Sequence, residues 1–341
     1  MATTVGHPLL RRAVERAAEH LIPLQVSMEL TYRCNLSCKH CYVDCRPKDE
    51  LALEEVKDIL DQLRAEGALY LLFTGGEILV RKDFFAIADY AKEKGFIVML
   101  LTNGTLISPA VAKRIAEIHP LTVRISIYGA TAATHEAVTG KPGSFEASVQ
   151  GASLLQAKGV FVSFEMILLD SNIHESGDAR CLAEKMGLHL QFGYELTPTK
   201  AGALTPQSYE AGLSQFIRFV DPDWLRSTRG SRGPGICKAG RCICSVSSTG
   251  DVSPCLLMPL WLGNLRQASF AEIWRTRPVA DLAYLRSLTP QDLAPCQECS
   301  LSSFCKKCLG VALSETGRLT SPSPSACRWA AMRHQLSDER R

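Results

Sequence analysis

Apolar and polar positions repeat with two different periods along residues 25–196. Short apolar runs bounded by turn residues indicate buried strands, whereas apolar residues three or four positions apart indicate amphipathic helices. The runs that predict strands are residues 25–31, 69–73, 96–102, 122–127, 160–168 and 188–194. The segments that predict helices are residues 52–66, 82–94, 109–118, 144–158 and 174–186. Strands that alternate with helices in this way are typical of consecutive parallel strand–helix–strand units.

Six such units fit either an open doubly wound sheet or a partial barrel, and the periodicity does not distinguish the two. In both architectures the chemistry lies at the carboxyl ends of the strands. Cys34 follows the first expected strand, residues 75–77 follow the second and residues 102–104 end or follow the third, while Ser126 lies at the end of the fourth. We therefore expect these residues to share one site.

The strand–helix alternation stops near residue 197, and few clear strand or helix patterns follow. Pro, Gly, Ser and Arg accumulate at residues 227–235, which predicts a linker or exposed loop. We expect an N-terminal helical segment, the α/β barrel, a connecting region, a cysteine-rich domain and a tail, at residues 1–24, 25–196, 197–235, 236–328 and 329–341. The cysteine-rich part has little apolar patterning, so bound metal would supply the missing folding free energy.

The chain has 341 residues, 14 of them cysteine, and nine of those cysteines follow residue 235. In a reducing cytoplasm, clustered thiols are more often metal ligands than disulfides. The N-terminus mixes Glu and Arg with its apolar residues, unlike a signal or transit peptide, and the apolar runs are too short to span a bilayer. With a net charge of +3 and no basic block, we expect a cytoplasmic protein without a nucleic-acid or membrane partner.

Three cysteines, Cys34, Cys38 and Cys41, form a C-x3-C-x2-C triplet after the first expected strand. Structural zinc is normally held by four ligands. Three thiolates suit a four-iron cluster that leaves one iron free, and a free iron can chelate the amine and carboxylate of S-adenosylmethionine. The alternative is a zinc-stabilised or free-thiol α/β protein.

A second motif, Gly75-Gly76-Glu77, follows the second expected strand. Two glycines let the backbone approach a ligand closely, and a carboxylate can accept charge-assisted hydrogen bonds from an ammonium group. Alone, such a motif is a weak signal. One strand–helix unit after a cysteine triplet of this spacing, it becomes a strong one.

With these two motifs the sequence resembles the radical S-adenosylmethionine superfamily, whose C-x3-C-x2-C loop follows the first strand of a partial (βα)6 barrel. The resemblance implies that the triplet holds the catalytic [4Fe–4S] cluster and that residues 75–77 bind the methionine part of the cofactor. The chain departs from the family at His40, where an aromatic residue is usual, and at Ile78, where proline is usual. His40 is still a flat ring, and the resemblance makes His40, Asn103 and Ser126 further cofactor contacts.

The second half carries a cysteine, a Gly-x4-Cys, a C-x2-C-x5-C-x2-C run and a final cysteine. This order resembles the SPASM extension of radical enzymes that modify peptides, in which the last spacing of the run is x3. By position, the resemblance implies two auxiliary [4Fe–4S] clusters. The first would be held by Cys237, Cys242, Cys255 and Cys308, and the second by Cys296, Cys299, Cys305 and Cys327. Cys244 competes with Cys242 for one position, and two structural zinc sites are the alternative.

The resemblance implies an enzyme that reductively cleaves S-adenosyl-L-methionine to a 5′-deoxyadenosyl radical, which abstracts hydrogen from a peptide or protein substrate. The electron would come from a reductant such as flavodoxin or ferredoxin. Only about 24 residues precede the first expected strand, too few for a leader-binding domain. We therefore expect a separate leader-peptide-binding protein or direct binding by the barrel. Two alternatives stay open: modification of a tetrapyrrole (haem pathway) or other small molecule, and a non-catalytic zinc or iron–sulfur binding module.

Overall fold

The structure, a computed structural model, describes residues 8–43, 49–194, 196–200, 202–221 and 237–338. Its first half is built on six parallel strands that neighbour one another in chain order. They are β1 (Gln25–Thr31), β2 (Tyr70–Gly75), β3 (Ile97–Thr102), β4 (Thr122–Ser126), β5 (Val162–Ile167) and β6 (His189–Gly193). The six predicted strands are confirmed. Six of the seven residues of β1 are buried, as expected for a parallel sheet that is covered on both faces.

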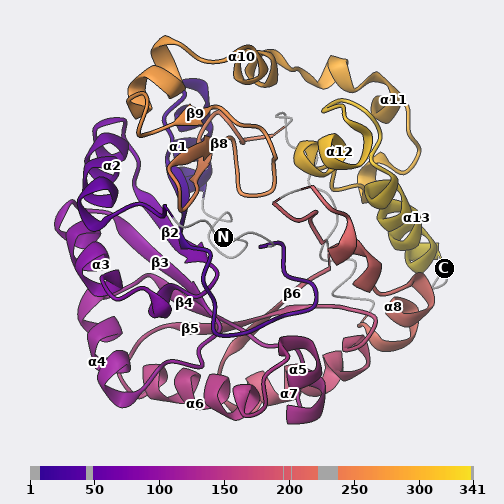
Figure 1. Cartoon of the computed structure of the whole chain (residues 1–341). Coiled ribbons are helices and arrows are strands. Elements are labelled where there is room, and N and C mark those ends of the chain that lie inside the picture. Colours follow the sequence, from indigo (N-terminus) through magenta and orange to yellow (C-terminus); the bar gives the residue numbers. More distant parts are fainter. Residues whose placement is uncertain (1–7, 44–48, 195, 201, 222–236, 339–341) are drawn as a thin grey trace.

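Helices connect consecutive strands and lie around the outside of the sheet (Figure 1). They are α2 (Leu53–Ala65), α3 (Phe84–Glu93), α4 (Pro109–Ile118), α5 (Ala132–Thr139), α6 (Ser144–Gln156) and α7 (Ser176–Lys185). The pattern predicted all of them except α5. Among the described strands the sheet ends at β6 on one side and β9 on the other. The first half is therefore a partial (βα)6 barrel.

The sheet continues from the barrel into the second half of the chain. β7 (Ile243–Val246) pairs in parallel with β1, and β8 (Asp251–Ser253) and β9 (Gly263–Asn264) follow in antiparallel order. The sequence did not predict these strands. Buried side chains of both halves, including Phe73 of β2 and Trp274, belong to one hydrophobic core.

Helices and short helical turns make up much of the remaining structure. They are α1 (Pro8–Glu19), η1 (Ile78–Val80), η2 (Ile173–Glu175), η3 (Thr205–Tyr209), α8 (Leu213–Phe219), η4 (Glu272–Thr276), α10 (Ala280–Ser287), η5 (Pro290–Leu293), α11 (Ala294–Gln297), η6 (Ser302–Phe304), α12 (Leu309–Thr316) and α13 (Pro324–Asp338). Figure 1 shows α10–α13 completing the ring of helices around the strands. α8 lies in the expected connecting region, and α13 runs across the expected boundary at residue 328. The predicted loop at 227–235 lies outside the described residues. Within the described residues, no helix is long and apolar enough to cross a membrane.

Candidate active site

The cysteine loop, residues 34–41, follows β1 and lies against the end of α5. The N–H of Ser37 donates to the carbonyl of Thr139 at 3.0 Å, and the N–H of Lys39 donates to the carbonyl of Val138 at 3.1 Å. The last carbonyls of a helix have no partner within the helix itself. The loop therefore supplies the donors that complete α5, and α5 fixes the loop.

Helix α5 is in turn held at its first turn. Thr131 caps the helix by accepting a hydrogen bond from the N–H of Thr134. The carboxylate of Glu175 accepts hydrogen bonds from the N–H groups of Ala130 at 2.6 Å and Thr131 at 3.1 Å, a favourable position for a negative charge. Gly140 ends the helix at a φ of 69°. Thr131 and Gly140 are the sequence signals that could have predicted α5.

The three thiols of the loop lie close enough for their charges to interact. Burial, followed by the charges of Cys41 and Cys34, raises the pKa of Cys38 to about 12. Burial also raises the pKa of Cys34. These thiols therefore keep their protons at neutral pH until a metal displaces them. Three soft sulfur donors on one loop are the ligands that iron–sulfur clusters require, so the donor set fits such a cluster.

Gly75 and Gly76 lie directly against the residues that lead into the cysteine loop. The N–H of Gly76 donates to the carbonyl of Thr31 at 2.7 Å, and the N–H of Glu77 donates to the carbonyl of Arg33 at 2.9 Å. A Cβ on Gly75 would lie 2.2 Å from the Thr31 oxygen, and one on Gly76 would lie 2.3 Å from the Arg33 oxygen. Gly75 also has a φ of 130°, which favours glycine. Both glycines thus permit close approach of the chain to itself.

The Glu77 side chain is fully buried and holds the end of β3. Its carboxylate accepts hydrogen bonds from Thr102 Oγ1 at 2.7 Å, from the N–H of Asn103 at 2.7 Å and from the N–H of Leu79 at 3.0 Å. Burial raises the pKa of Glu77, and these hydrogen bonds act in the opposite direction. Three of the roughly four acceptor positions of a carboxylate are therefore already used by the chain.

Asn103 connects the end of β3 to the cysteine loop. Its Nδ2 donates to Asn35 Oδ1 at 2.9 Å and lies 3.8 Å from Cys34 Sγ. Its Oδ1 accepts from the N–H of Thr105 at 2.9 Å. The Gly-Gly-Glu segment and the cysteine loop are thus joined through one asparagine.

His40 and Ser126 both contact Tyr128. The His40 and Tyr128 rings pack edge to face, with 4.7 Å between their centres, and Ser126 hydrogen-bonds to Tyr128. Burial lowers the pKa of His40 to about 4, so the ring is neutral at pH 7. Within the described part of the chain, the buried His40 Nδ1 has no hydrogen-bond partner. Such an atom is costly unless a bound group satisfies it, and a polar group of a cofactor would do so.

In the second half, four thiols form one neighbouring group. Cys255 lies near Cys237 and Cys308, and Cys242 lies near Cys237. Burial raises the pKa of Cys255 to about 12. Cys244 is also close to Cys242 and Cys255, but it lies on β7 and is fully buried in the main hydrophobic core.

The remaining four cysteines of the predicted ligand set form a second group. Cys305 lies near Cys327, and both lie near Cys296 and Cys299. Lys307 Nζ donates to Cys296 Sγ at 3.3 Å. Among the described residues, no three His, Cys, Asp or Glu side chains are arranged to hold a single metal ion. In a four-iron cluster each thiolate binds a different iron.

A cavity of about 550 Å³ lies beside the cysteine loop, at the junction of the two halves. Tyr32 and Tyr42 line it from the barrel, and residues 197–200 line it from the connecting region. The second half contributes apolar residues of the segment 256–261, including Trp261, a residue that is 58% exposed. The cavity is therefore open to solvent at an aromatic rim.

Two family models match the chain. Residues 28–178 match the Radical SAM superfamily, and residues 237–300 match SPASM, an iron–sulfur cluster-binding domain. The AdoMet-dependent heme synthase of Methanosarcina barkeri is 29% identical over 337 residues, covering 89% of this chain and 95% of that protein. Mycofactocin maturase MftC of Mycolicibacterium smegmatis is 30% identical over 350 residues, covering 95% of this chain and 87% of that protein. The structure of Streptococcus suis SuiB bound to precursor peptide SuiA has a TM-score of 0.71 at 16% identity, covering 93% of this chain and 79% of that one. At this identity the likeness shows the fold alone.

Proposed function

We propose that this chain, which belongs to the radical SAM superfamily and carries the iron–sulfur cluster-binding SPASM domain, abstracts hydrogen from a peptide or protein substrate during maturation of ribosomally made peptides. The chain is an enzyme whose cofactors are S-adenosyl-L-methionine and iron–sulfur clusters. The observation that carries the peptide assignment is the 30% identity to mycofactocin maturase across 87% of that enzyme.

In the proposed site, Cys34, Cys38 and Cys41 would hold the catalytic cluster through their thiolates. When bound, this cluster and S-adenosylmethionine supply a one-electron reductive cleavage whose product, the 5′-deoxyadenosyl radical, abstracts hydrogen from an unactivated carbon. The residues of the chain hold the cofactor in place, orient the substrate and exclude water.

The proposed cofactor contacts are Gly75, Gly76, Glu77, His40, Asn103 and Ser126. Their positions relative to the cysteine loop support this assignment. Gly76 and Glu77 donate their N–H groups to carbonyls of residues that precede Cys34, and Nδ2 of Asn103 lies near the Cys34 sulfur. The unpartnered Nδ1 of His40 offers a polar contact to an incoming group. Because the Glu77 carboxylate is largely occupied by chain donors, its contribution includes shaping the end of β3.

We assign the two auxiliary clusters to the two groups of neighbouring thiols, Cys237, Cys242, Cys255 and Cys308, and Cys296, Cys299, Cys305 and Cys327. Cys242 is preferred to Cys244 as a ligand because Cys244 pairs with Val26 of β1 and is enclosed among apolar side chains. The side chain of Cys242 lies near Cys237 instead. These clusters would transfer the second electron of the reaction or hold the substrate.

The same proposal includes three features of the cellular setting. A flavodoxin or ferredoxin would deliver the electron, because cleavage of the cofactor consumes one electron at a low potential. A separate leader-peptide-binding protein would present the substrate. A cytoplasmic location suits the reduced thiols that the clusters require.

A second candidate substrate is a tetrapyrrole, favoured by the 29% identity to AdoMet-dependent heme synthase over 95% of that protein. The radical chemistry would be the same and only the hydrogen donor would differ. The cavity beside the cysteine loop has an aromatic and aliphatic wall, which is compatible with an apolar peptide side chain as well as with a flat macrocycle. The two substrates therefore have to be separated by experiment.

The test is to reconstitute the chain anaerobically with iron and sulfide and to supply S-adenosylmethionine and dithionite. Short peptides encoded by neighbouring genes and a carboxylated iron porphyrin are offered separately. We expect 5′-deoxyadenosine formation, and a mass loss in a peptide with hydrogen transferred to the 5′ carbon. The variant with Cys34, Cys38 and Cys41 all changed to Ala should form no 5′-deoxyadenosine, lose about four irons and keep about eight. Conversion of the porphyrin and of no peptide would overturn the substrate class but not the radical reaction.

A further inference from the structure

The segment Asp49–Leu51 lies between the two halves of the molecule and is held by the second half. The N–H of Leu51 donates to the carbonyl of Ser248 at 2.7 Å. The guanidinium of Arg266 donates from Nη1 to the carbonyl of Asp49 at 2.9 Å. The SPASM half therefore fixes the backbone on both sides of Glu50.

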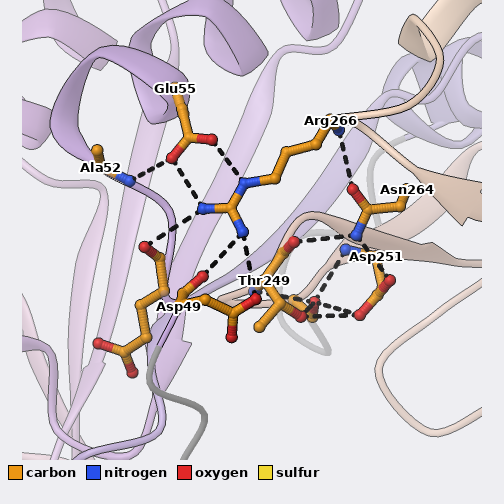
Figure 2. Close-up of polar contacts among 9 residues, drawn as sticks. Asp49, Ala52, Glu55, Thr249, Asp251, Asn264 and Arg266 are labelled. Carbon is orange, nitrogen blue, oxygen red and sulfur yellow. Dashed lines mark hydrogen bonds and ion pairs between the residues drawn. The ribbon is translucent and has the colours of Figure 1, made fainter.

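Arg266 is held rigidly in this position (Figure 2). Its guanidinium makes two hydrogen bonds to the Glu55 carboxylate, at 2.6 and 2.9 Å, the paired geometry that arginine and carboxylate favour. Its backbone N–H donates to Asn264 Oδ1 at 2.9 Å, and Asn264 Nδ2 donates to Asp251 at 2.9 Å. A hydrogen-bonded network in the second half thus supports the side chain that reaches the barrel.

The Glu50 side chain points from this segment to the start of the cysteine loop. Its carboxylate accepts hydrogen bonds from Thr31 Oγ1 at 2.7 Å, from the N–H of Tyr32 at 2.8 Å and from Arg33 Nε at 3.2 Å. The side chain is only 13% exposed, so solvent screens these bonds little. One carboxylate therefore binds the three consecutive residues that precede Cys34.

Two of these three residues also bind the Gly-Gly-Glu segment, through their carbonyl groups. The carbonyls of Thr31 and Arg33 accept the N–H groups of Gly76 and Glu77. The Glu50 carboxylate binds hydrogen-bond donors of residues 31–33. The N–H groups of the Gly-Gly-Glu segment bind carbonyl acceptors of the same stretch. A shift of residues 31–33 would therefore change the position of the cysteines relative to the proposed cofactor contacts.

We propose that Glu50 is a positioning residue for the catalytic cysteine loop, and that Arg266 acts through it to couple the SPASM half to the loop. The assignment rests on the proposed function in one respect, that the loop carries the catalytic cluster. Residues that orient metal ligands through hydrogen bonds typically contribute about 10- to 100-fold to affinity or activity. Glu50 acts in this way through the backbone that precedes the first ligand.

Arg275 provides a matched control for Arg266. It also comes from the second half, pairs with Glu66, the residue that follows α2, and donates to the carbonyl of His20 at 3.2 Å. The Arg275 side chain is 37% exposed and the Arg266 side chain is 34% exposed. In the described contacts Arg275 does not reach the segment 49–51, so its loss removes a similar ion pair between the halves without touching Glu50.

The experiment compares Glu50→Gln, Glu50→Asp, Arg266→Gln and Arg275→Gln in the reconstituted full chain. Substrate-independent formation of 5′-deoxyadenosine, iron content, the electron paramagnetic resonance spectrum with S-adenosylmethionine, and amide exchange at residues 31–33 are measured. We expect Glu50→Gln to keep its iron, to slow cofactor cleavage by about 10- to 100-fold, to alter the spectrum of the cofactor-bound cluster and to speed exchange at residues 31–33. Glu50→Asp should recover part of the rate because it keeps the charge.

Arg266→Gln should change the same measurements in the same direction by a smaller factor, and Arg275→Gln should leave them unchanged. Wild-type cleavage and spectrum in Glu50→Gln would overturn the proposal, as would equal effects of the two arginine variants. If Glu50→Gln does not fold, Glu50→Asp and Arg266→Gln decide between these outcomes. Cleavage of S-adenosylmethionine without substrate does not depend on which substrate the enzyme takes. The result of this test can therefore be interpreted even if the peptide assignment fails.

Discussion

The carboxylate of Glu29, buried on β1, accepts a 2.7 Å hydrogen bond from Nζ of Lys200, which lies 171 residues later in the chain. Tyr42, next to Cys41, donates its hydroxyl to the same carboxylate at 2.9 Å, and its carbonyl accepts the N–H of Lys200 at 2.9 Å. The ammonium group also lies 5.5 Å from the centre of the Tyr42 ring. Lys200 thus ties the connecting region to the end of the cysteine loop.

Replacing Lys200 by Met should lower the free energy of unfolding by about 1–3 kcal/mol, because a buried carboxylate loses a charged donor. The measurement is the urea midpoint of the reconstituted chain. Lys57→Met is the control, since Lys57 pairs with Glu54, whose side chain is 78% exposed, and exposed pairs contribute less than about 1 kcal/mol. Equal midpoints for the two variants would show that the Glu29 pair adds nothing beyond a surface contact.

Gly76→Ala should impair the site, because the new Cβ would lie 2.3 Å from the carbonyl oxygen of Arg33. The backbone must shift, which costs about 1–3 kcal/mol and moves the Gly-Gly-Glu segment away from the cysteine loop. We expect cofactor cleavage to slow by at least tenfold, roughly the effect of misplacing a reacting group. Gly177→Ala on α7 is the control: a Cβ there meets nothing within 4 Å, and the helix should gain about 0.4–1 kcal/mol. A fully active Gly76→Ala variant would contradict this account of the glycine.

Cys242→Ser and Cys244→Ala should separate ligand from core residue. Loss of Cys242 should remove about four irons and lower the soluble yield, since ligand binding contributes to folding. Loss of the Cys244 thiol should leave the iron content unchanged and reduce stability by about 1 kcal/mol through a small cavity. Iron analysis of both variants after anaerobic reconstitution is the measurement. Iron loss confined to the Cys244 variant would reverse the assignment.

His135 on α5 should make the protein less stable in acid. Burial lowers the pKa of His135 to about 4 from 6.5, and its Nδ1 accepts the N–H of Tyr128 at 3.2 Å. In the unfolded chain His135 takes up a proton below about pH 6.5, whereas in the folded chain it does so only below about pH 4. The free energy of unfolding therefore falls as the pH decreases through this window. At about 1.4 kcal/mol per pKa unit, the total loss is up to about 3 kcal/mol.

His135→Asn keeps an acceptor for Tyr128 but does not titrate in this range. The difference in unfolding free energy between the variant and the wild type should therefore change in favour of the variant as the pH falls from 7 to about 4. Urea midpoints at several pH values supply the measurement. A difference that is constant with pH would mean that His135 titrates alike in the folded and unfolded states.

The sequence predicted the six strands because they are continuous apolar runs, which appear in the pattern whatever their partners are. The partial barrel, rather than an open sheet, followed from the family resemblance of the two motifs and not from the pattern. It missed α5, whose eight residues Ala132–Thr139 are too few to show a helical period. It missed β7 because Cys242, just before this strand, and Cys244, within it, stand in the sequence as competing candidates for one ligand position in an irregular segment. Cysteine is also a small apolar residue, and Cys244 is buried as one.

The site was predictable to the extent that its residues are neighbours in the chain. The cysteine triplet and Gly75–Glu77 carry their spacing in the sequence. Arg266 and Glu55 are separated by 211 positions, and no local pattern relates them. No sequence pattern indicates that the Glu77 carboxylate accepts hydrogen bonds from the end of β3. These bonds depend on how the ends of two strands lie in space.

The pairing of β7 with β1 has a consequence for anyone who would exchange parts between enzymes of this kind. A cut after the barrel would expose the edge of β1, an almost fully buried strand, as a row of unpaired backbone groups that invites aggregation. A transplant of the second half would have to bring β7–β9 with it and match their register to a new β1. Because one sheet runs through both halves, a chimera that exchanges the second half has to preserve the pairing of β7 with β1.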